Sequence, residues 1–214
     1  MSQIKLKHSG GNSVIIAAPD SNPASDRTLK LPSNADGTVL TTTNPKSKSV
    51  IQTVNMVKTD AVSLLMSTSY QDVSGFTISI TPEFANSKII LAGAIVLDSY
   101  EQYSFGKFVR SINGGSYSSP TGWLGDAAGS RTVSQFGNNY RAPSGPDGFT
   151  ACPMAIYAVD TDHNTTDPIT YKLQYKNEPT GTTYYIYFNR SHNDADASDR
   201  PRSCSHLTLM EVAA

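Results

Sequence analysis

Alternation of apolar and polar residues at a period of two is the pattern that most constrains this sequence. It is clearest in residues 76–80 (FTISI) and 171–175 (YKLQY). This period is typical of strands with one buried face, because successive side chains of a strand point to opposite sides. No stretch of helical length carries apolar residues at i, i+3, i+4 and i+7, and only Thr81-Pro82-Glu83 has a helix-start pattern, from which we expect one turn. The sequence therefore predicts an all-β protein.

The residue types agree with this fold class. Serine and threonine contribute 27 and 21 of 214 residues, whereas only 16% are charged, a composition that favours strands and turns over helices. About eight strand patterns after residue 50 predict an antiparallel β-sandwich, jelly-roll-like in topology. Besides the two alternating stretches, strands are expected at Gln3 to His8, Val14 to Ala17, Arg27 to Leu31, Val39 to Thr42, Val50 to Thr59, Lys88 to Leu97, Tyr103 to Ile112, Cys152 to Val159, Tyr184 to Arg190 and Ser205 to Val212.

The strand patterns and turns divide the chain into two modules. Residues 1–43 are a small N-terminal β module, residues 44–49 a polar, proline-containing linker, and residues 50–214 the sandwich. A module of some forty residues rarely holds a core alone. We therefore expect it to bury its apolar side chains against other copies of itself or against the surface of a larger assembly.

Two expected strands, Lys88 to Leu97 and Cys152 to Val159, are apolar on both faces. Such strands lie centrally in a sheet or are covered on the second face by another subunit. Cys152 and Cys204 lie in strand-like runs, and we expect buried free thiols, with a disulfide as the alternative. Free thiols are consistent with synthesis in a reducing cytoplasm.

Charge excludes several classes of partner. The chain has 17 Lys+Arg and 18 Asp+Glu, a net charge of −1, so it lacks the basic surface that nucleic acids or anionic membranes require. Residues 1–50 carry +3 and the remainder −4, which suits a basic attachment end and an acidic outward domain. The longest apolar run is far shorter than the roughly 20 residues of a membrane span, and no signal peptide is expected.

Several segments resemble proteins of tailed phages. The N-terminal segments IKLKHSGGNSV (Ile4 to Val14) and RTLKLPSNADGTVLTT (Arg27 to Thr42) look like the N-terminal module of fibre-like virion proteins of marine phages, especially cyanophages. The remainder is similar to a β domain common at the C-terminus of tail-fibre and head-fibre proteins. That similarity lies in VSGFTISITP (Val73 to Pro82), SKIIL (Ser87 to Leu91), GDAAGSRT (Gly125 to Thr132), YKLQYK (Tyr171 to Lys176), YFNRS (Tyr187 to Ser191) and LTLMEVA (Leu207 to Ala213).

The resemblance implies a non-enzymatic structural protein located in the virion. It implies a homotrimer attached to other virion proteins through residues 1–43, with the C-terminal domain in contact with a host glycan or protein. Heptads and shaft repeats are absent from the sequence, which favours a short knob, head fibre or fibre tip over a long fibre. The alternatives are a capsid decoration or cement protein and a dedicated host glycan-binding module.

Catalytic and metal-binding motifs are weak. The sequence has no G-x-S-x-G elbow and no phosphate-loop ending, so we expect no catalytic residue and no cofactor. Asp194, Asp196 and Asp199 in HNDADASD are oxygen ligands suited to a hard cation such as Ca²⁺, although the loop does not match an EF-hand. The alternative is a solvated turn neutralised by Arg190, Arg200 and Arg202.

Aromatic residues supply the candidates for receptor contact. If Ile186 and Phe188 point inward, Tyr185 and Tyr187 point outward, either to a receptor or to a subunit seam. The polar stretch from Asn113 to Thr150 is long enough to be functional. It contains three further candidates, Tyr117, Trp123 and Tyr140, of which Trp123 is alternatively a packing anchor.

Overall fold

The computed structural model describes residues 3–17, 21, 23, 43, 45–65, 67–99, 103–138, 151–178 and 185–214. The chain divides into two compact units, Met1–Leu40 and Thr41–Ala214. Among the described residues no helix is long and apolar enough to cross a bilayer. The two units are described separately.

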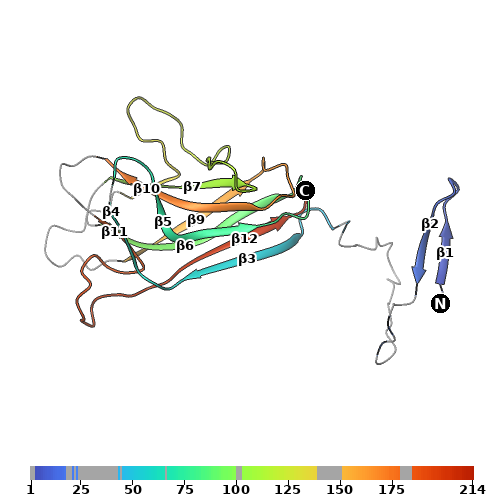
Figure 1. Cartoon of the computed structure of the whole chain (residues 1–214), viewed down its shortest axis with the longest axis horizontal. Helices are drawn as coiled ribbons and strands as arrows, with labels where there is room; N and C mark the ends of the chain where they lie inside the picture. Colours follow the sequence, from blue (N-terminus) through green and yellow to red (C-terminus); the bar gives the residue numbers. More distant parts are fainter. Residues whose placement is uncertain are drawn as a thin grey trace, which may run out of the picture. The chain divides into compact units, whose positions relative to one another are not determined.

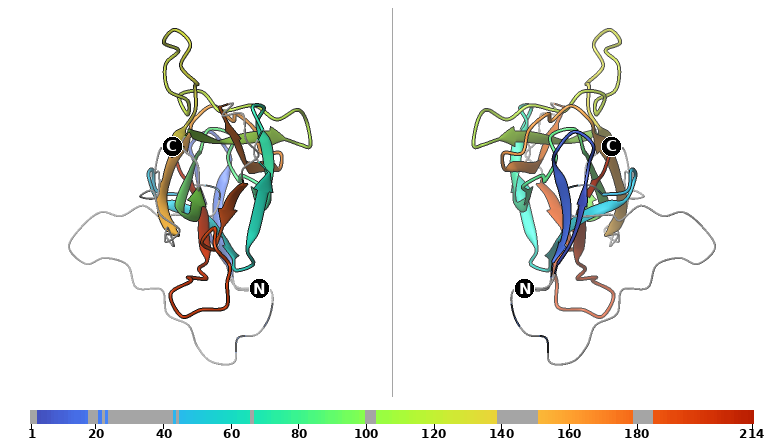
Figure 2. Two further views of the ribbon diagram at one scale, coloured as in Figure 1. Left: turned by 90° about the vertical axis from the view of Figure 1, so that its left-hand side faces the viewer. Right: turned by 90° about the vertical axis from the view of Figure 1, so that its right-hand side faces the viewer.

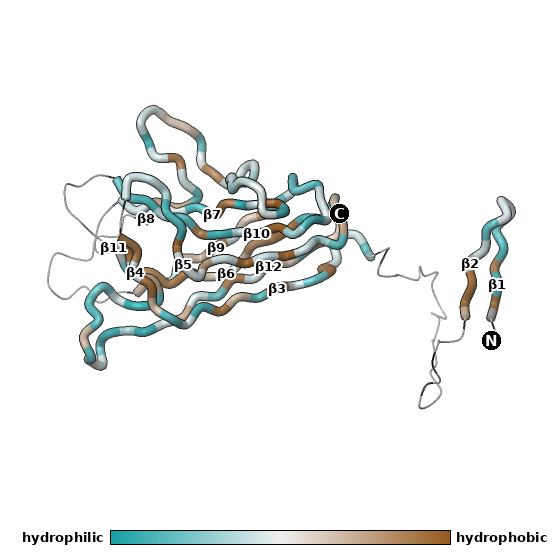
Figure 3. Tube along the Cα trace, in the orientation of Figure 1, coloured by the Kyte–Doolittle hydropathy of each residue, from teal (hydrophilic) through white to brown (hydrophobic). Residues whose placement is uncertain are grey.

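The first unit contains an antiparallel hairpin of β1 (Gln3–Lys7) and β2 (Ser13–Ala17). Gly11 takes a φ of 101° in the turn, a left-handed conformation that favours glycine. Ile4 and Ile16 are opposite each other across the pair and are 62% and 58% exposed. Figure 3 shows hydrophobic residues in both strands of the hairpin. The hairpin therefore leaves its apolar side chains unburied. The strands expected at Arg27 to Leu31 and Val39 to Thr42 lie outside the described residues.

The second unit is an antiparallel β-sandwich (Figure 1). One sheet contains β3 (Val50–Lys58), β4 (Val62–Leu65), β6 (Lys88–Ser99), β9 (Cys152–Asp160), β11 (Tyr185–Phe188) and β12 (Ser205–Val212). The other sheet contains β5 (Gln71–Ile80), β7 (Ser104–Ile112), β8 (Phe136–Asn138) and β10 (Ile169–Asn177). The two layers are seen end-on in Figure 2.

The strand pairing is that of a jelly roll. β9 pairs with one edge of β6, while β12 and then β11 share the other edge and pair in turn with β3 and β4. Successive strand positions therefore run β9–β6–β12–β3 in one sheet and β5–β10–β7–β8 in the other. We count β3 with β4 as one strand of the jelly roll, and β11 with β12 as another. Each strand then lies in the opposite sheet from the strand before it in the chain, except that β7 and β8 are neighbours in the same sheet. This is the double Greek key of an eight-stranded jelly roll, which confirms the predicted fold class.

The alternating sequence produces the core directly. Every odd residue of β10 from Ile169 to Asn177 is buried, and every even one is half-buried on the outer face. The inward side chains of both sheets form one cluster, in which Phe188 packs against Phe76 and Tyr175 with ring centroids 5.3 and 5.5 Å apart. This aromatic packing joins the two layers.

Some details differ from the sequence-based expectations. β6 is a central strand, but β9 pairs with β6 alone and forms an edge, so its apolar outer face is not explained by a central position. The two cysteines are free, but Cys152 is exposed at the start of β9 and Cys204 is half-buried just before β12. The expectation of buried thiols was therefore wrong, because both residues lie where a strand begins.

The segment expected to be a linker is tied to the sandwich at its C-terminal part. Lys48 N–H donates to the carbonyl of Ala213, and Ala213 N–H donates to the carbonyl of Ser49, at 3.0 and 2.9 Å. The chain thus enters the sandwich beside its own C-terminus. We call this part of the sandwich, residues 46–49 and 213–214, the linker end.

Candidate functional site

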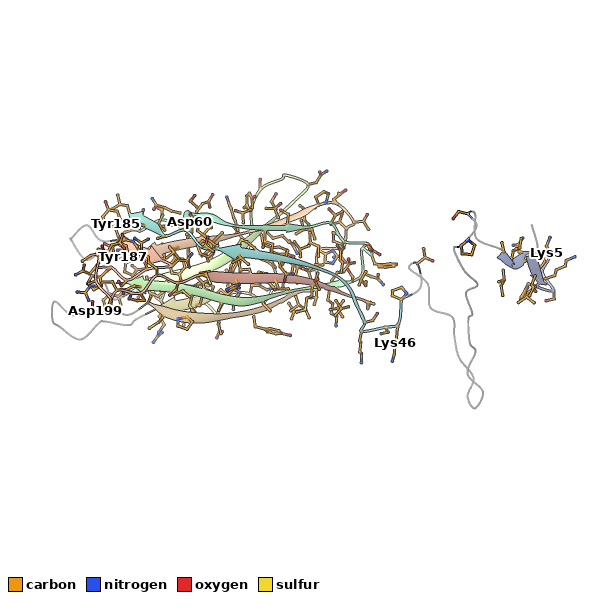
Figure 4. The ribbon with its side chains drawn as sticks, turned by 90° about the horizontal axis from the view of Figure 1, so that it is seen from below. Lys5, Lys46, Asp60, Tyr185, Tyr187 and Asp199 are labelled. Atoms are coloured by element: carbon orange, nitrogen blue, oxygen red, sulfur yellow. The ribbon has the colours of Figure 1, made fainter. Side chains whose placement is uncertain are left out.

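The end of the sandwich opposite the linker end carries the most distinctive surface. Figure 4 places Lys46 at one end and Tyr185, Tyr187, Asp60 and Asp199 at the other. We call the second end the distal end and define it by β4, β11 and residues 189–204. The second unit therefore receives the preceding chain at one end and carries this surface at the opposite end.

Two tyrosines of β11 are stacked at the distal end. Ile186 and Phe188 are buried, and Tyr185 and Tyr187 point outward, as the alternation predicted. Their rings lie 6.1 Å apart at 28°, and Tyr185 is 41% exposed. Partial burial raises the pKa of Tyr187, with Arg190 opposing the rise, so the Tyr187 phenol is a neutral donor at neutral pH.

An arginine extends this aromatic stack. The Arg190 guanidinium lies 4.4 Å from the centre of the Tyr187 ring and donates from Nη2 to Ser63 Oγ at 2.8 Å. Arg190 also pairs with Asp194 at 3.2 Å, and Asp194 pairs with Arg202 at 2.6 Å. The distal end therefore combines a flat aromatic surface with phenol, guanidinium and carboxylate groups.

Buried polar contacts hold residues 189–204 on the sheet. Asn189 is buried with a φ of 61°, and its Nδ2 donates to the carbonyls of Lys58 and Asp60 at 2.9 and 3.0 Å. Ser205 Oγ donates to Asn189 Oδ1 at 2.6 Å and accepts from the N–H of Val96 at 2.9 Å. The segment leaves the sheet at Asn189 and returns at Ser205, so this network fixes both of its ends.

A second buried anchor sits under the same segment. The Asp98 carboxylate is 2% exposed and accepts the backbone N–H of His192 at 2.8 Å, with His192 Nδ1 3.1 Å away. Lys58 is also buried and pairs with Asp60 at 2.7 Å. These contacts give the distal surface a rigid support of the kind that binding sites need.

The predicted metal ligands do not converge. Asp194 pairs with Arg190 and Arg202, Asp199 pairs with Arg200, and Asp196 is exposed. Within the described part of the chain no three His, Cys, Asp or Glu side chains are grouped to hold a metal ion. Two of the three carboxylates, Asp194 and Asp199, are therefore neutralised by arginines, as the alternative interpretation expected.

The other aromatic candidates lie elsewhere. Tyr117 is 41% exposed, but its ring is covered by Lys172 Nζ at 3.7 Å on the outer face of the β5–β10–β7–β8 sheet. Tyr140 lies outside the described residues. Trp123 is buried, stacks on Tyr171 at 5.6 Å and donates from Nε1 to the carbonyl of Val159 at 3.0 Å. Trp123 is therefore a packing anchor and is not exposed for receptor contact.

A buried charge cluster surrounds this anchor. Arg110 Nη1 pairs with Asp160 at 2.6 Å and with Asp162 at 2.8 Å, while the Tyr171 hydroxyl donates to Asp160 at 2.6 Å. The Thr121 hydroxyl and then Arg110 hold the pKa of Asp162 well below its usual range, against the effect of partial burial. Burial, with Asp160 adding to it, raises the pKa of Tyr171 well above its usual range. The cluster is saturated internally and acts as a structural clamp on the 113–135 segment.

Arg190 was expected from the sequence as a neutralising charge, but its contact with Tyr187 was not predicted. The role of Asn189 in fixing the distal segment was not predicted either. The signal available in the sequence was the break in the apolar pattern after Phe188, where Asn189 and Arg190 replace the alternation. Which carbonyls Asn189 reaches depends on the pairing of β4 with β11, and only the structure gives that.

Comparison with known proteins gives few matches. No family model matches the sequence. No curated protein matches it either. Among solved structures, the chain is similar to that of infectious bursal disease virus Gx strain, with a TM-score of 0.39 and 11% identity over 95% of this chain and 47% of that one. The Gt strain gives 0.38 and 12% over 95% and 48%, and the VP2 subviral particle of the same virus gives 0.37 and 11% over 94% and 47%.

The chain thus spans about half the length of the virus chains that it matches. TM-scores below 0.5 at this identity are too low to assign a fold or a function. The jelly-roll assignment therefore rests on the strand order of this chain. A proposal for the function of the protein has to rest on the surfaces described above.

Proposed function

We propose that this protein is a structural component of a tailed-phage virion, a short homotrimeric appendage without enzymatic activity. Its N-terminal module attaches to other virion proteins, and its jelly roll presents the distal end to the host surface. The phage-like segments of the sequence support the virion setting. The difference between the two ends of the sandwich carries the proposal. The chain arrives at the linker end, and the tyrosine–arginine surface lies at the opposite end.

The N-terminal hairpin supports attachment through the first module. Ile4, Leu6 and Ile16 are exposed on the hairpin, and a two-stranded hairpin alone is marginally stable in water. Burying these side chains against a partner removes apolar surface from water at about 25 cal/mol per Å². A docking role for the module accounts for apolar residues that the hairpin itself cannot cover.

Carbohydrate is the ligand class that best suits the distal end. The exposed Tyr185 ring offers a flat apolar face to the C–H side of a sugar ring, and the nearby phenol, guanidinium and carboxylate groups bond to hydroxyls. A single site of this size binds weakly. Three sites on a trimer and several trimers on a particle raise the overall affinity by avidity.

Adsorption of particles to host cells tests this role. Particles that carry Tyr185→Ala with Tyr187→Ala are expected to contain the normal amount of protein but to adsorb about tenfold more slowly, because avidity amplifies the loss at each site. Tyr117→Ala is the matched control, since Tyr117 has the same 41% exposure as Tyr185 but lies away from the distal end. Equal adsorption of both variants would contradict the host-contact role. Loss of the protein from particles would show that the tyrosines line a subunit seam.

A further inference from the structure

The outer face of the β9–β6–β12–β3 sheet is free of ionised side chains over its whole centre. The strand registers align three rows of four outward residues across these strands. The rows are Val57, His206, Ala94 and Ala155; Asn55, Thr208, Ala92 and Tyr157; and Thr53, Met210, Ile90 and Val159. None of the twelve is Lys, Arg, Asp or Glu, and none is buried. We call these twelve residues the uncharged face.

The other sheet shows that this pattern is not general. Its outer face carries Asp72, Lys107, Lys172 and Lys176, which form ion pairs and cover the rings of Tyr70 and Tyr117. Charged side chains are depleted from the centres of subunit interfaces because their desolvation is costly. The two outer faces therefore differ in charge: the uncharged face has the composition of a subunit interface, and the outer face of the other sheet has that of a solvent-exposed surface.

The sequence of β6 and β9 supports the same conclusion. Both strands are apolar on both sides, the pattern of strands that are buried twice. Among the described residues of the second unit, their inner side is covered by the core that contains Leu91 and Ile156, whereas the residues of the uncharged face are not buried. Three polar members of the uncharged face are already paired: Thr208 Oγ1 donates to Asn55 Oδ1 at 2.8 Å, and His206 Nε2 lies 3.0 Å from Cys204 Sγ. Covering this face therefore leaves few polar groups without a partner.

The shape of the uncharged face points to a second copy of the same chain as its partner. Tyr157 projects from β9 and is 71% exposed. Ala92 lies directly across from it, and Ala94 and Ala155 form the adjacent pair. The face thus contains both a projecting ring and a shallow patch of small residues that a ring can cover. Uncharged surfaces of neighbouring copies also come together without like-charge repulsion, whereas copies of the lysine-bearing face would repel each other.

The sheet that carries the uncharged face is large enough for an interface. Its four strands are roughly 19 Å wide and about 30 Å long, so its whole outer face covers about 600 Å² per copy, and the uncharged face, which spans five residues of each strand, occupies about half of it. Two copies that cover the whole outer face bury roughly 1,200 Å², the lower bound for specific interfaces. We infer that the uncharged face is the surface through which copies of this chain associate, with Tyr157 of one copy seated on Ala92, Ala94 and Ala155 of the next. This inference rests on the proposed homotrimer and names the surface that forms it.

Sedimentation velocity of the full-length chain at micromolar concentration tests the inference. The wild type is expected to sediment as a trimer, and Tyr157→Glu is expected to raise the dissociation constant at least about 100-fold, because it places an unpaired charge in the contact. Ala155→Glu, a second exposed position of the face, is expected to act in the same way. Thr77→Glu, at an exposed position of β5, is the matched control and should remain a trimer.

The outcomes separate the inference from the proposed function. A trimeric wild type whose Tyr157→Glu and Ala155→Glu variants stay trimeric overturns the inference and leaves the proposed trimer intact. A monomeric wild type overturns both. A wild-type dimer that both variants dissociate supports the uncharged face as the contact but contradicts the trimer. Near-ultraviolet circular dichroism of each variant verifies the native fold, and dissociation by Thr77→Glu as well would overturn the inference.

Discussion

Glu211 is a buried acid that joins β12 to the turn after β5. It is fully buried and accepts Gln52 Nε2 at 2.6 Å, the N–H of Glu83 at 2.9 Å and the N–H of Phe84 at 3.0 Å. Burial raises the pKa of Glu211, but these hydrogen bonds outweigh it and the net pKa lies below the usual 4.5. The turn expected at Thr81-Pro82-Glu83 is thus held by a charge from the last strand.

This geometry predicts a specific pH dependence. A carboxylate whose pKa is lower in the folded state stabilises the fold above its unfolded pKa, and this contribution is lost as the pH falls through the folded pKa. We expect Glu211→Gln to lower the free energy of unfolding by about 2 kcal/mol at pH 7, because hydrogen bonds to a charged acceptor are lost. The difference in the free energy of unfolding between variant and wild type should become smaller as the pH drops below about 4.5, where the wild type begins to lose the stabilisation that the charged Glu211 provides.

Urea unfolding followed by fluorescence is a suitable measurement, since the single tryptophan, Trp123, is buried against Tyr171. Asp196→Asn is the control, because it removes an exposed carboxylate of the distal segment. A difference in the free energy of unfolding between Glu211→Gln and wild type that stays constant from pH 7 to pH 3 would refute the role assigned to Glu211.

At the scale of elements, β11 and β12 both pair along the same edge of β6 and are separated by residues 189–204. Their partners β4 and β3 are separated at the matching place, between Lys58 and Val62. β6 continues past both breaks without interruption. Asn189 bridges the breaks by bonding to the carbonyls of Lys58 and Asp60. The distal surface is thus built where two adjacent strands open and a third stays continuous.

Asn189→Ala is expected to loosen this junction. The change removes the donor to the carbonyls of Lys58 and Asp60 and the acceptor of the Ser205 hydroxyl, so we expect a loss of about 3 kcal/mol in the free energy of unfolding. Trypsin should cut the native variant faster than wild type at Arg190, Arg200 or Arg202, because the segment is no longer fixed at its start. Asn86→Ala, at an exposed turn position, is the control. Equal cleavage of variant and wild type would show that Asn189 does not hold the segment.

The sequence predicted long, regular strands better than short ones. The predicted bounds of Ser205 to Val212 match those of β12, whose eight residues alternate between buried and outward positions without a break. β4 and β8 were missed, since four and three residues are too few to show a period. The outward position of Tyr185 and Tyr187 followed from alternation alone. The burial of Trp123 did not, because it depends on Tyr171 and the carbonyl of Val159, which are far away in the sequence.

At the scale of the whole molecule, the second unit offers three different surfaces. The linker end receives the chain at residues 46–49, the distal end carries the tyrosine–arginine stack, and the uncharged face lies along one sheet. In the proposed function, attachment, host contact and self-association therefore occupy separate parts of the jelly roll. Substitutions in one surface should leave the other two functions unchanged, which makes the account testable surface by surface.

Electron microscopy of the intact virion tests the central claim most directly. The account predicts jelly-roll densities in groups of three on the particle, with the end near Lys46 facing the particle and the end with Tyr185 and Tyr187 facing away. Particles that contain no such density, or in which the tyrosine end lies against the particle, would contradict it.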